Sequence, residues 1–596
     1  MTEISRRELL AMAGLLVAGG SEAAGEPRKV LRIAFSTAET GFDPAQVSDL
    51  YSRSVTPHIF EGLYRYDHLF RPFKLRPQTA AAMPEISADF RTWTFRLRPG
   101  IFFSEDPAFG GKRRELTAQD YVYSWQRLVD PAVKSPTFSE ILEQGIVGLE
   151  AARAKAADNK LPFDYDAPIE GLRALDRHTL QVKLQEPRPR FIEIIAQGDL
   201  YGAVAREVVE AAGSDIAGRP VGTGPYMLKE WRRSSFIALE RNPGYREDLY
   251  DEQPAEDDAE GQALLARFKG RRLPMIDRVE ISIIDEDQPR WLAFLNRQID
   301  MVEVPLNFAG QAVPNGKLAP NLAKQGVQLR RVVAPDMTFT YFNMDDPTVG
   351  GYTPEKVALR RAIGLAMNVP REIETMRRGQ AIQAQAGLPP HTYGYDPSLK
   401  TENGDYDPAR AKALLDLFGY RDSNGDGWRE MPDGRPLLLK MGSTPDQLTR
   451  QLNEIMEKSM SAVGLRMGFE VAQWPEHLKA ARAGKLMMWY LGVTASQPDG
   501  QDFISNMYSP QIGGQNYARF RNEAYDRIFS RMSFLPDGDE RLRLFREEIE
   551  YQLAYMPYKI HVHRVINSLM HAGVSGYRKP LFGTSWWAYV DREPPA

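Results

Sequence analysis

One short stretch constrains the fold of this 596-residue chain more than any other: Arg219–Trp231, which places Pro220, Gly222, Gly224 and Pro225 within a few positions. Glycine permits positive φ angles and close approach of backbone, whereas proline fixes φ and removes a hydrogen-bond donor. After these residues the stretch alternates between apolar and polar side chains. The pattern therefore predicts a rigid turn that leads into a β-strand, and such a turn suits a stiff frame better than a catalytic loop.

Chain length, charge and cysteine content exclude several classes of protein. A chain of 596 residues is too long for one hydrophobic core, so we expect two or three domains. Its 79 acidic and 75 basic residues give a net charge of -4, which does not favour nucleic acid as a partner. The sequence contains no cysteine, which excludes disulfides, a cysteine nucleophile, cysteine-ligated zinc and lipidation at a lipobox cysteine.

The N-terminus has the pattern of an export signal. The pair Arg6–Arg7 opens an apolar run to Gly20 that is too short to span a bilayer. Ser21–Ala23 or Ala23–Gly25 fits a cleavage site, so we expect a signal peptide at residues 1–25. The arginine pair indicates a twin-arginine signal, and a general secretory signal is the alternative. Because no later stretch is apolar over a membrane-spanning length, the sequence predicts a soluble periplasmic protein without a lipid anchor.

Local patterns predict individual elements along the chain. Val30–Phe35 is apolar and partly alternating, and Thr92–Arg98 alternates strictly before the turn at Pro99–Gly100, so both are expected to be strands. Thr117 begins a segment of helical spacing that runs to Trp125, and its hydroxyl makes it a suitable N-cap.

Seven motifs in a fixed order resemble those of the family 5 extracellular solute-binding proteins, the peptide and nickel receptors of ABC importers. They cover the chain from about residue 30 to its end. The motifs are Phe60–Asp67, Trp93–Gly100, Leu116–Asp120, Arg219–Trp231, Tyr341–Asp345, Val357–Asn368 and Tyr406–Leu415.

The resemblance implies an α/β fold of the periplasmic binding protein type, with two lobes, a ligand cleft between them and an additional inserted domain (cluster C type, type II-like). The implied boundaries are residues 26–57, 190–333 and 559–596 for the first lobe, 58–189 for the inserted domain and 334–558 for the second lobe. Residues 247–270 depart from the family pattern. They are rich in acidic residues and alanine, with few large apolar groups, so we expect a surface insertion there.

The implied ligand contacts centre on Met487–Phe503, where an apolar strand is followed by a polar loop. In peptide-binding members an aspartate of this loop pairs with the ligand's α-ammonium group, but the matching position here is Ser496. Asp499 is a possible substitute, and it is equally suited to the start of a helix. The expected ligand-binding residues are Gln46, Ser48, Tyr51, Gln385, His391, Trp489, Tyr490, Thr494, Ser496, Gln497 and Asp499.

Metal and catalytic motifs give weak signals. Among the standard patterns, Gly-x-Ser-x-Gly, Ser-x-x-Lys, His-Glu-x-x-His and the Walker A loop are absent from the sequence. His561 and His563 would share one face of a strand, but they lie in an apolar segment. Asp422–Trp428 resembles the start of a calcium loop, although Asp433 stands where the bidentate glutamate belongs. We therefore expect a structural turn at Asp422–Trp428, with calcium as the alternative, and neither metal nor cofactor elsewhere.

The resemblance implies the periplasmic substrate-binding component of an ABC importer, with oligopeptides or modified peptides as the leading ligands. An opine, sugar or metal chelate is the alternative ligand. The protein is expected to be a monomer that delivers its ligand, by hinge closure, to permease subunits with their ATPases. An exported hydrolase that uses paired carboxylates such as Asp499 and Asp502 is a remote alternative.

Overall fold

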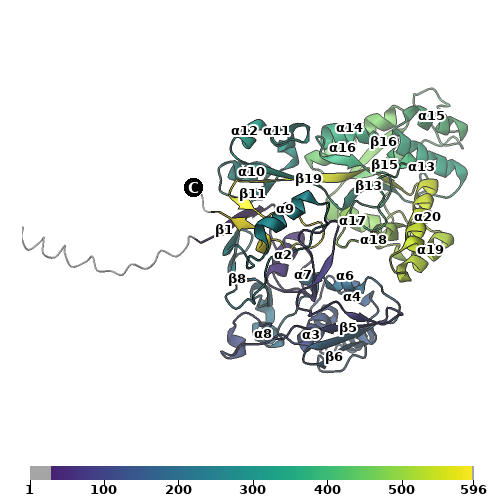
Figure 1. Ribbon diagram of the computed structural model, residues 1–596. Coiled ribbons are helices and arrows are strands. Elements are labelled where there is room, and N and C mark those ends of the chain that lie inside the picture. The colour runs from purple at the N-terminus through teal and green to yellow at the C-terminus, as the bar shows by residue number, and fades with distance from the viewer. Residues whose placement is uncertain (1–27, 594–596) are drawn as a thin grey trace, which may run out of the picture.

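The computed structural model describes residues 28–593, so the signal peptide predicted at residues 1–25 lies outside the described part of the chain. Helices and sheets are mixed, and the sheets belong to two lobes and an inserted region (Figure 1). Both ends of the described chain lie in the first lobe, where Lys29 and Asp591 form an ion pair at 2.6 Å. The predicted two-lobe α/β fold is confirmed.

The first lobe contains two larger sheets and a two-stranded one formed by β20 (Val574–Ser575) and β21 (Asp591–Arg592). The strand order of one is β1 (Val30–Phe35), β10 (Arg278–Ile283), β9 (Phe236–Arg241) and β8 (Tyr226–Arg232). The order of the other is β11 (Met301–Glu303), β19 (Val562–Met570) and β12 (Gln328–Val333), and β14 (Ala381–Gln383) also pairs with β19. Leu31, Ile33 and Phe35 of β1 are buried, as the alternating pattern predicts for one face of a strand.

The second lobe is built on one mixed sheet. Its strand order is β16 (Arg466–Val471), β15 (Leu438–Ser443), β17 (Met488–Thr494), β13 (Asp336–Phe342) and β18 (Tyr558–Ile560). Every residue of β13 is buried, because helices cover both faces of this part of the sheet (Figure 1). Its sequence nonetheless alternates between polar and apolar residues, and buried polar side chains of β13 find partners, as Asp336 does with Arg564 and Thr340 with His561.

The chain crosses between the lobes at two adjacent places. Only Ala334 and Pro335 separate β12 from β13, and only His561 separates β18 from β19. The Ala334 amide donates to the Arg564 carbonyl at 2.8 Å, and the His561 amide donates to the Thr338 carbonyl at 2.8 Å. The crossing strands are therefore hydrogen-bonded to each other, and the two lobes share one paired connection.

The inserted region has its own sheet and core. The strand order is β4 (Glu85–Ile86), β5 (Thr92–Arg96), β7 (Thr179–Lys183) and β6 (Leu172–Asp176). The helix α3 (Ala118–Val129) packs on it, with Thr117 and Asp120 forming a reciprocal capping box at its start. The strand and helix predicted in this region are confirmed, and all four strands lie within residues 58–189. The boundaries proposed for the lobes stay predictions.

The remaining helices cover the sheets and connect the lobes. In the first lobe and the inserted region they are α2 (Leu50–Val55), α4 (Phe138–Leu142), α5 (Leu149–Asn159), α6 (Phe191–Ile195), α7 (Gly198–Tyr201), α8 (Arg206–Ala212), α9 (Ala259–Phe268), α10 (Asp287–Leu295), α11 (Ala309–Ala312) and α12 (Pro320–Ala323). In the second lobe they are α13 (Pro354–Ala366), α14 (Val369–Arg371), α15 (Pro408–Leu417), α16 (Gln447–Ser461), α17 (Trp474–Arg482), α18 (Gln501–Ile504), α19 (Glu523–Phe534) and α20 (Asp539–Tyr555). Within residues 28–593, every helix is too short or too polar to cross a membrane.

The stretch Arg219–Trp231 forms the turn and strand that its sequence predicts. Strand β8 begins at Tyr226, directly after the glycines and prolines. The Gly224 amide donates to the Ile59 carbonyl at 2.8 Å, so the turn is hydrogen-bonded to the backbone that leads into the inserted region. A Cβ atom on Gly222 would lie 2.0 Å from the Ile59 carbonyl oxygen. Glycine is therefore required here by close approach of two backbones.

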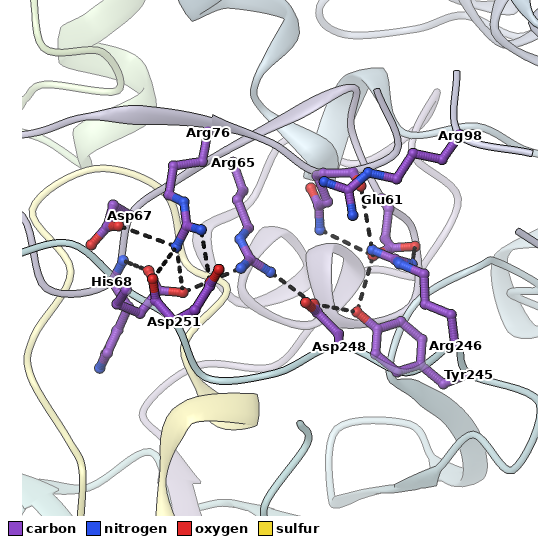
Figure 2. A network of polar contacts seen from close by, with 12 residues as sticks. Glu61, Arg65, Asp67, His68, Arg76, Arg98, Tyr245, Arg246, Asp248 and Asp251 are labelled. Carbon is purple, nitrogen blue, oxygen red and sulfur yellow. Dashed lines mark hydrogen bonds and ion pairs between the residues drawn. The ribbon is translucent and has the colours of Figure 1, made fainter. Parts of the chain in front are cut away.

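A buried network of ion pairs joins the inserted region to the first lobe (Figure 2). Arg246 contacts the two carboxylate oxygens of Glu61 at 2.7 and 2.8 Å, and Arg65 contacts Asp248 at 2.9 Å. The Glu61 side chain has no exposed surface. An unpaired charge at that depth would be strongly destabilising, so these pairs hold the two parts in one orientation.

Residues 247–270 are a correction to the sequence interpretation. Tyr250 and Phe268 are completely buried in the core of the first lobe, and the carboxylate of Glu252 accepts hydrogen bonds within the network. The segment is therefore anchored in the core at Tyr250 and Phe268, which its composition did not predict, whereas Glu247 and Gly270 at its two ends are exposed, and its being an insertion stays a prediction. Two aromatic residues are enough to anchor it, because each large ring buries a large apolar area, and the composition of the whole segment conceals them.

The close contact at Gly222 generates a test. We expect Gly222→Ala to lower the thermal unfolding midpoint and to cost about 1–3 kcal/mol or more, because the added Cβ forces two backbones apart. The matched control is Gly310→Ala in α11, where a Cβ would meet no atom within 4 Å. Equal midpoints for the two variants, measured by differential scanning calorimetry, would contradict the packing argument.

Candidate functional site

Strand β17 carries three of the expected ligand-binding residues, and its two faces differ. Trp489 is 2% exposed and packs in the core of the second lobe against Trp474, at 6.1 Å between ring centroids. Tyr490 and Thr494 point to the opposite face, since side chains alternate along a strand. The prediction that Trp489 offers its ring to a ligand is therefore not supported, because that ring belongs to the core.

Tyr490 belongs to a polar network beside the lobe crossing. Its hydroxyl donates to Glu372 Oε1 at 3.1 Å and contacts Arg377, while His561 Nδ1 lies 2.8 Å from Glu372 Oε2. Burial by itself would raise the pKa of Glu372, but the charges of His561 and Arg377 hold that pKa below its ordinary value. The Tyr490 hydroxyl is therefore already hydrogen-bonded to residues of the protein itself.

An exposed polar strip continues from the end of β17. Thr494 pairs in register with Asp336 of β13, and its hydroxyl accepts a hydrogen bond from Arg564 at 3.2 Å. Ser496 is exposed and Gln497 is half-buried. Arg564 comes from the first-lobe strand β19, so residues from both lobes meet in this strip.

Beyond Trp489, one edge of β17 has no neighbouring strand. Strand β13 pairs with β17 along its full length, whereas β15 on the other side pairs only at Met488 and Trp489. Within the described part of the chain, no strand covers the other edge from Leu491 to Thr494. Backbone N–H and C=O groups at such an edge are free to pair with an added strand.

Asp499 is held by the protein's own cations. Its carboxylate contacts Arg190 at 2.9 Å and Arg541 at 2.8 Å, and Oδ1 accepts a hydrogen bond from the Gln501 amide at 2.7 Å at the start of α18. The helix-start interpretation is therefore favoured. A free carboxylate for a ligand's ammonium group, the other interpretation of Asp499, is not supported, because two guanidinium groups neutralise the charge.

Arg190 lies one residue past the proposed end of the inserted region, directly before α6, which packs on the core of that region, and it links α6 to the second lobe. Besides Asp499, it donates to the carbonyl oxygens of Ser533 and Leu535 at 2.9 and 2.8 Å, at the C-terminal end of α19, and to Gln501 Oε1 at 3.0 Å. The sequence did not single out Arg190, because nothing in its local pattern indicates partners so far along the chain.

One turn further on, Glu193 of α6 is buried without compensation. Its side chain is 8% exposed, and it forms neither an ion pair nor a side-chain hydrogen bond with any residue between 28 and 593. Burial, followed by the negative charge of Asp499, raises the pKa of Glu193 to about 8. We refer to α6, α18 and the charged residues between them, Arg190, Glu193, Asp499 and Arg541, as the α6–α18 junction.

The segment after the first strand is partly exposed. Gln46 and Ser48 are exposed, so both are available to a ligand. Tyr51 is half-buried: its hydroxyl contacts the Ser36 hydroxyl, and its ring lies 4.9 Å from that of Phe35. Tyr51 is therefore a packed helix residue with one accessible side.

Gln385 and His391 lie in the loop that follows β14. Gln385 Oε1 accepts a hydrogen bond from the Thr401 amide at 3.0 Å, and the residue lines a cavity of about 320 Å³ together with Leu388 and Ile549. His391 Nε2 lies 3.0 Å from the Val333 carbonyl oxygen, directly before the lobe crossing. The structure therefore brings His391, and not Gln385, close to the strip at the end of β17.

The two metal candidates have protein partners. His563 Nδ1 lies 2.6 Å from the Asp336 carbonyl oxygen, and both ring nitrogens of His561 have partners within the protein, so His561 offers no free ligand atom. In the predicted turn, ligand atoms of Asp422, Asp426 and Glu430 lie within 4.8 Å of one another. The Asp422 carboxylate accepts hydrogen bonds from backbone amides of the turn, which favours the structural interpretation.

The structural interpretation of this turn generates a test. Titration of calcium into chelator-treated protein is expected to give no heat, because the turn holds no calcium ion.

Comparison with known proteins places the chain in a family. The model of the bacterial extracellular solute-binding proteins, family 5 (middle), matches residues 74–515, so the chain belongs to this family. The resemblance carried by the seven motifs is confirmed.

Individual relatives are similar over nearly the whole chain. Di/tripeptide-binding protein 2 of Pseudomonas aeruginosa (strain UCBPP-PA14) is 25% identical over 583 residues, which cover 96% of this chain and 97% of that protein. Heme-binding protein A of Haemophilus influenzae is 23% identical over 508 residues, 84% of this chain and 81% of that protein. The solved structure of the periplasmic binding protein DppA from Helicobacter pylori, in complex with peptide STSA, matches with a TM-score of 0.69 at 22% identity, covering 95% and 99% of the two chains.

The contacts of Arg190 generate a test of lobe association. Arg190→Ala removes charge-assisted hydrogen bonds between the start of α6 and the second lobe, each about 1.5–3 kcal/mol, while Asp499 keeps Arg541 as a partner. We expect a larger radius of gyration in small-angle scattering of the ligand-free protein. The control is Arg177→Ala, which removes an exposed ion pair within the inserted region. Identical scattering from all three proteins would show that Arg190 does not hold the lobes.

Glu193 generates a prediction about pH. Its pKa of about 8 in the folded protein lies above the value of about 4.3 for an unfolded glutamate, so the folded state binds more protons. This contribution to stability is present at low pH and is lost as the pH rises through 8. Glu193→Gln is therefore expected to be more stable than the parent at pH 9, by more than about 1 kcal/mol, and to show no gain at pH 4. Thermal unfolding midpoints measured from pH 4 to pH 9 test this prediction, and the exposed Glu457→Gln of α16 is the control.

Proposed function

We propose that this protein is the periplasmic receptor of an ABC importer and that it captures peptides between its lobes without changing them chemically. The observation that carries the proposal is the uncovered edge of β17 from Leu491 to Thr494, which lies where residues of both lobes meet. An extended peptide adds to such an edge as a further strand, with its main chain supplying hydrogen bonds. The names of relatives, di/tripeptide-binding protein 2 among them, support the same ligand class.

Capture works by rotation of the lobes about their paired crossing. The connection at Ala334–Pro335 and His561 is short and hydrogen-bonded, so it directs the motion as a hinge. A peptide on β17 is then enclosed by the first lobe, and the exposed Gln46 and Ser48 are the side chains we propose to contact it. The closed monomer docks on permease subunits, whose ATPases drive import.

Ser496 determines which peptides fit. Relatives that hold a free α-ammonium group with an aspartate have a charge at this position, and this chain has none. Burying an ammonium group without a counter-ion is costly. We therefore propose that Ser496 does not hold a free peptide N-terminus. The ligands we propose are capped or modified peptides, or peptides whose N-terminus is bound by other residues.

A second candidate is a non-peptide solute. Heme-binding protein A is a relative over most of its length, so the frame also accommodates a ligand without a peptide backbone. The lack of a charge at Ser496 favours this candidate specifically.

Mass spectrometry of material that copurifies with the protein from a native periplasm tests the proposal. We expect peptides, and their removal and return are expected to lower and restore the thermal midpoint, since a ligand bound only to the folded state stabilises it. Replacement of Gly492 by proline is expected to weaken rebinding, because the odd-numbered residues of β17 direct their N–H groups to β13, whereas Gly492 directs its own to the uncovered edge. The exposed Val471→Pro at the end of β16 is the control for insertion of proline. Copurification of a non-peptide solute would favour the second candidate, and hydrolysis of a bound peptide would contradict both.

A further inference from the structure

A cavity of about 60 Å³ lies between three segments that are far apart in the sequence. They are the loop between the paired strands β2 (Tyr64–Tyr66) and β3 (Leu75–Pro77), the start of α7, and residues 580–585 near the C-terminus. Phe70, Phe73 and Phe582 supply aromatic surface to the cavity wall. The volume suits a small polar group, such as a carboxylate, together with ordered water.

The cavity adjoins helix α2 of the first lobe. Asp199 in the cavity wall forms an ion pair with Arg53 of α2 at 2.5 Å, and the Thr584 hydroxyl donates to the Arg53 carbonyl oxygen at 2.9 Å. Ser48, which we propose to contact the peptide, lies just before this helix. The cavity is therefore adjacent to the part of the first lobe that faces the proposed ligand.

Arg71 in the cavity wall has a charge that no ion pair compensates among residues 28–593. Its guanidinium group is half-buried and donates only to carbonyl oxygens, those of His68, Phe70 and Lys579, at 2.9 to 3.1 Å. Burial, followed by the positive charge of Arg578, lowers the pKa of Arg71 to about 10. The other charged residues of the wall are paired: Arg65 with Asp248, Asp67 with Arg76, and Asp199 with Arg53. Within the described chain, the uncompensated charge of the wall is therefore positive.

The Tyr66 hydroxyl is a second unused donor in the same wall. It is buried and forms no hydrogen bond with any residue between 28 and 593, and the Tyr66 ring lies 6.1 Å from that of Phe582. A buried hydroxyl without a partner is unfavourable, so an occupant that accepts its hydrogen bond stabilises the site. A carboxylate accepts hydrogen bonds and also neutralises a guanidinium group, so it meets both requirements of this wall.

We propose that this cavity binds a carboxylate group of the ligand, with Arg71 as its cationic partner and the Tyr66 hydroxyl as a hydrogen-bond donor. The inference deepens the proposed function and rests on it. Burial lowers the pKa of His391 in the second lobe, and the charge of Arg71 adds to this effect, so Arg71 lies near that lobe. A peptide held by a carboxylate needs no counter-ion at Ser496, which agrees with the lack of a charge there.

The test uses two pairs of N-acetylated tripeptides. The members of the first pair are trialanine with a free C-terminal carboxylate and trialanine with a C-terminal amide. In the second pair both C-termini are amides, and the central residue is glutamate or glutamine. By isothermal titration calorimetry, we expect the parent to bind the carboxylate member of at least one pair about tenfold more tightly or better, or ~1.4 kcal/mol. The pair that shows the preference identifies the source of the carboxylate.

Variants of the cavity wall locate the preference. Arg71→Gln is expected to abolish most of it, and Arg71→Lys to retain part of it, because lysine keeps the charge but not the planar fork. Tyr66→Phe is expected to reduce the preference by about threefold or more without lowering the thermal midpoint of the ligand-free protein, because its hydroxyl has no bond to lose. The matched control is Tyr64→Phe, whose hydroxyl donates to the Ala82 carbonyl oxygen at 3.0 Å. This control is expected to lower the midpoint and to keep the full preference, as is the exposed Arg177→Gln for loss of an arginine.

The remaining outcomes separate the carboxylate site from the peptide function. Equal affinities within both pairs, or a preference that Arg71→Gln or Tyr66→Phe leaves at full strength, overturns the site while the peptide function stands. If Arg71→Gln does not fold, the comparison of Tyr66→Phe with Tyr64→Phe decides. If none of the peptides binds, the peptide function fails, and glutarate serves as the probe. A saturable rise of the parent's thermal midpoint with glutarate, absent in Tyr66→Phe, upholds the site, and no such rise overturns it.

Discussion

The pairing of Asp336 with Arg564 is the contact on which the arrangement of the lobes depends. The carboxylate of Asp336, almost completely buried, accepts hydrogen bonds from the Arg564 amide at 2.9 Å and from its Nε at 2.6 Å. Asp336 begins a strand of the second lobe and Arg564 lies in a strand of the first, so a single ion pair ties the two crossings together. Loss of the Arg564 side chain would leave the buried charge of Asp336 without a partner, which is strongly destabilising. The uncovered edge of β17 ends at this pair, because Thr494 lies opposite Asp336.

Two clusters of buried charged side chains differ in whether their charges are compensated. In the network of Figure 2, Glu61 and Arg246 make two parallel contacts, so the charges are compensated and the inserted region is fixed to the first lobe. At the α6–α18 junction, Glu193 has no such partner, although it is buried to a similar degree. The first arrangement stabilises a permanent interface. The second leaves the buried carboxyl group of Glu193 without a compensating cation among residues 28–593.

Much of the frame was predictable from the sequence, and less of the site. The strand at Val30–Phe35 and the cap at Thr117 follow from local spacing, and both are as expected. The segment 247–270 was interpreted from average composition, which hides the burial of Tyr250 and Phe268. In the expected site, the polar character of residues after β17 was predictable, whereas the direction of Trp489 into the core depends on the strand's register with β13. A shift of one residue would exchange the two faces.

The sequence by itself determined several strands and helices and the family, because these depend on neighbours along the chain and on motifs in a fixed order. The need for glycine at Gly222 was decided by tertiary structure, because the backbone it approaches belongs to the distant Ile59. Tertiary structure alone decided which charges are compensated. Arg190 and Gln501 are 311 residues apart and meet only after two lobes and an inserted region have folded. Burial and pairing change the energy of a charge far more than residue type does, so the neutralised Asp499 and the unpaired Glu193 could be told apart only in space.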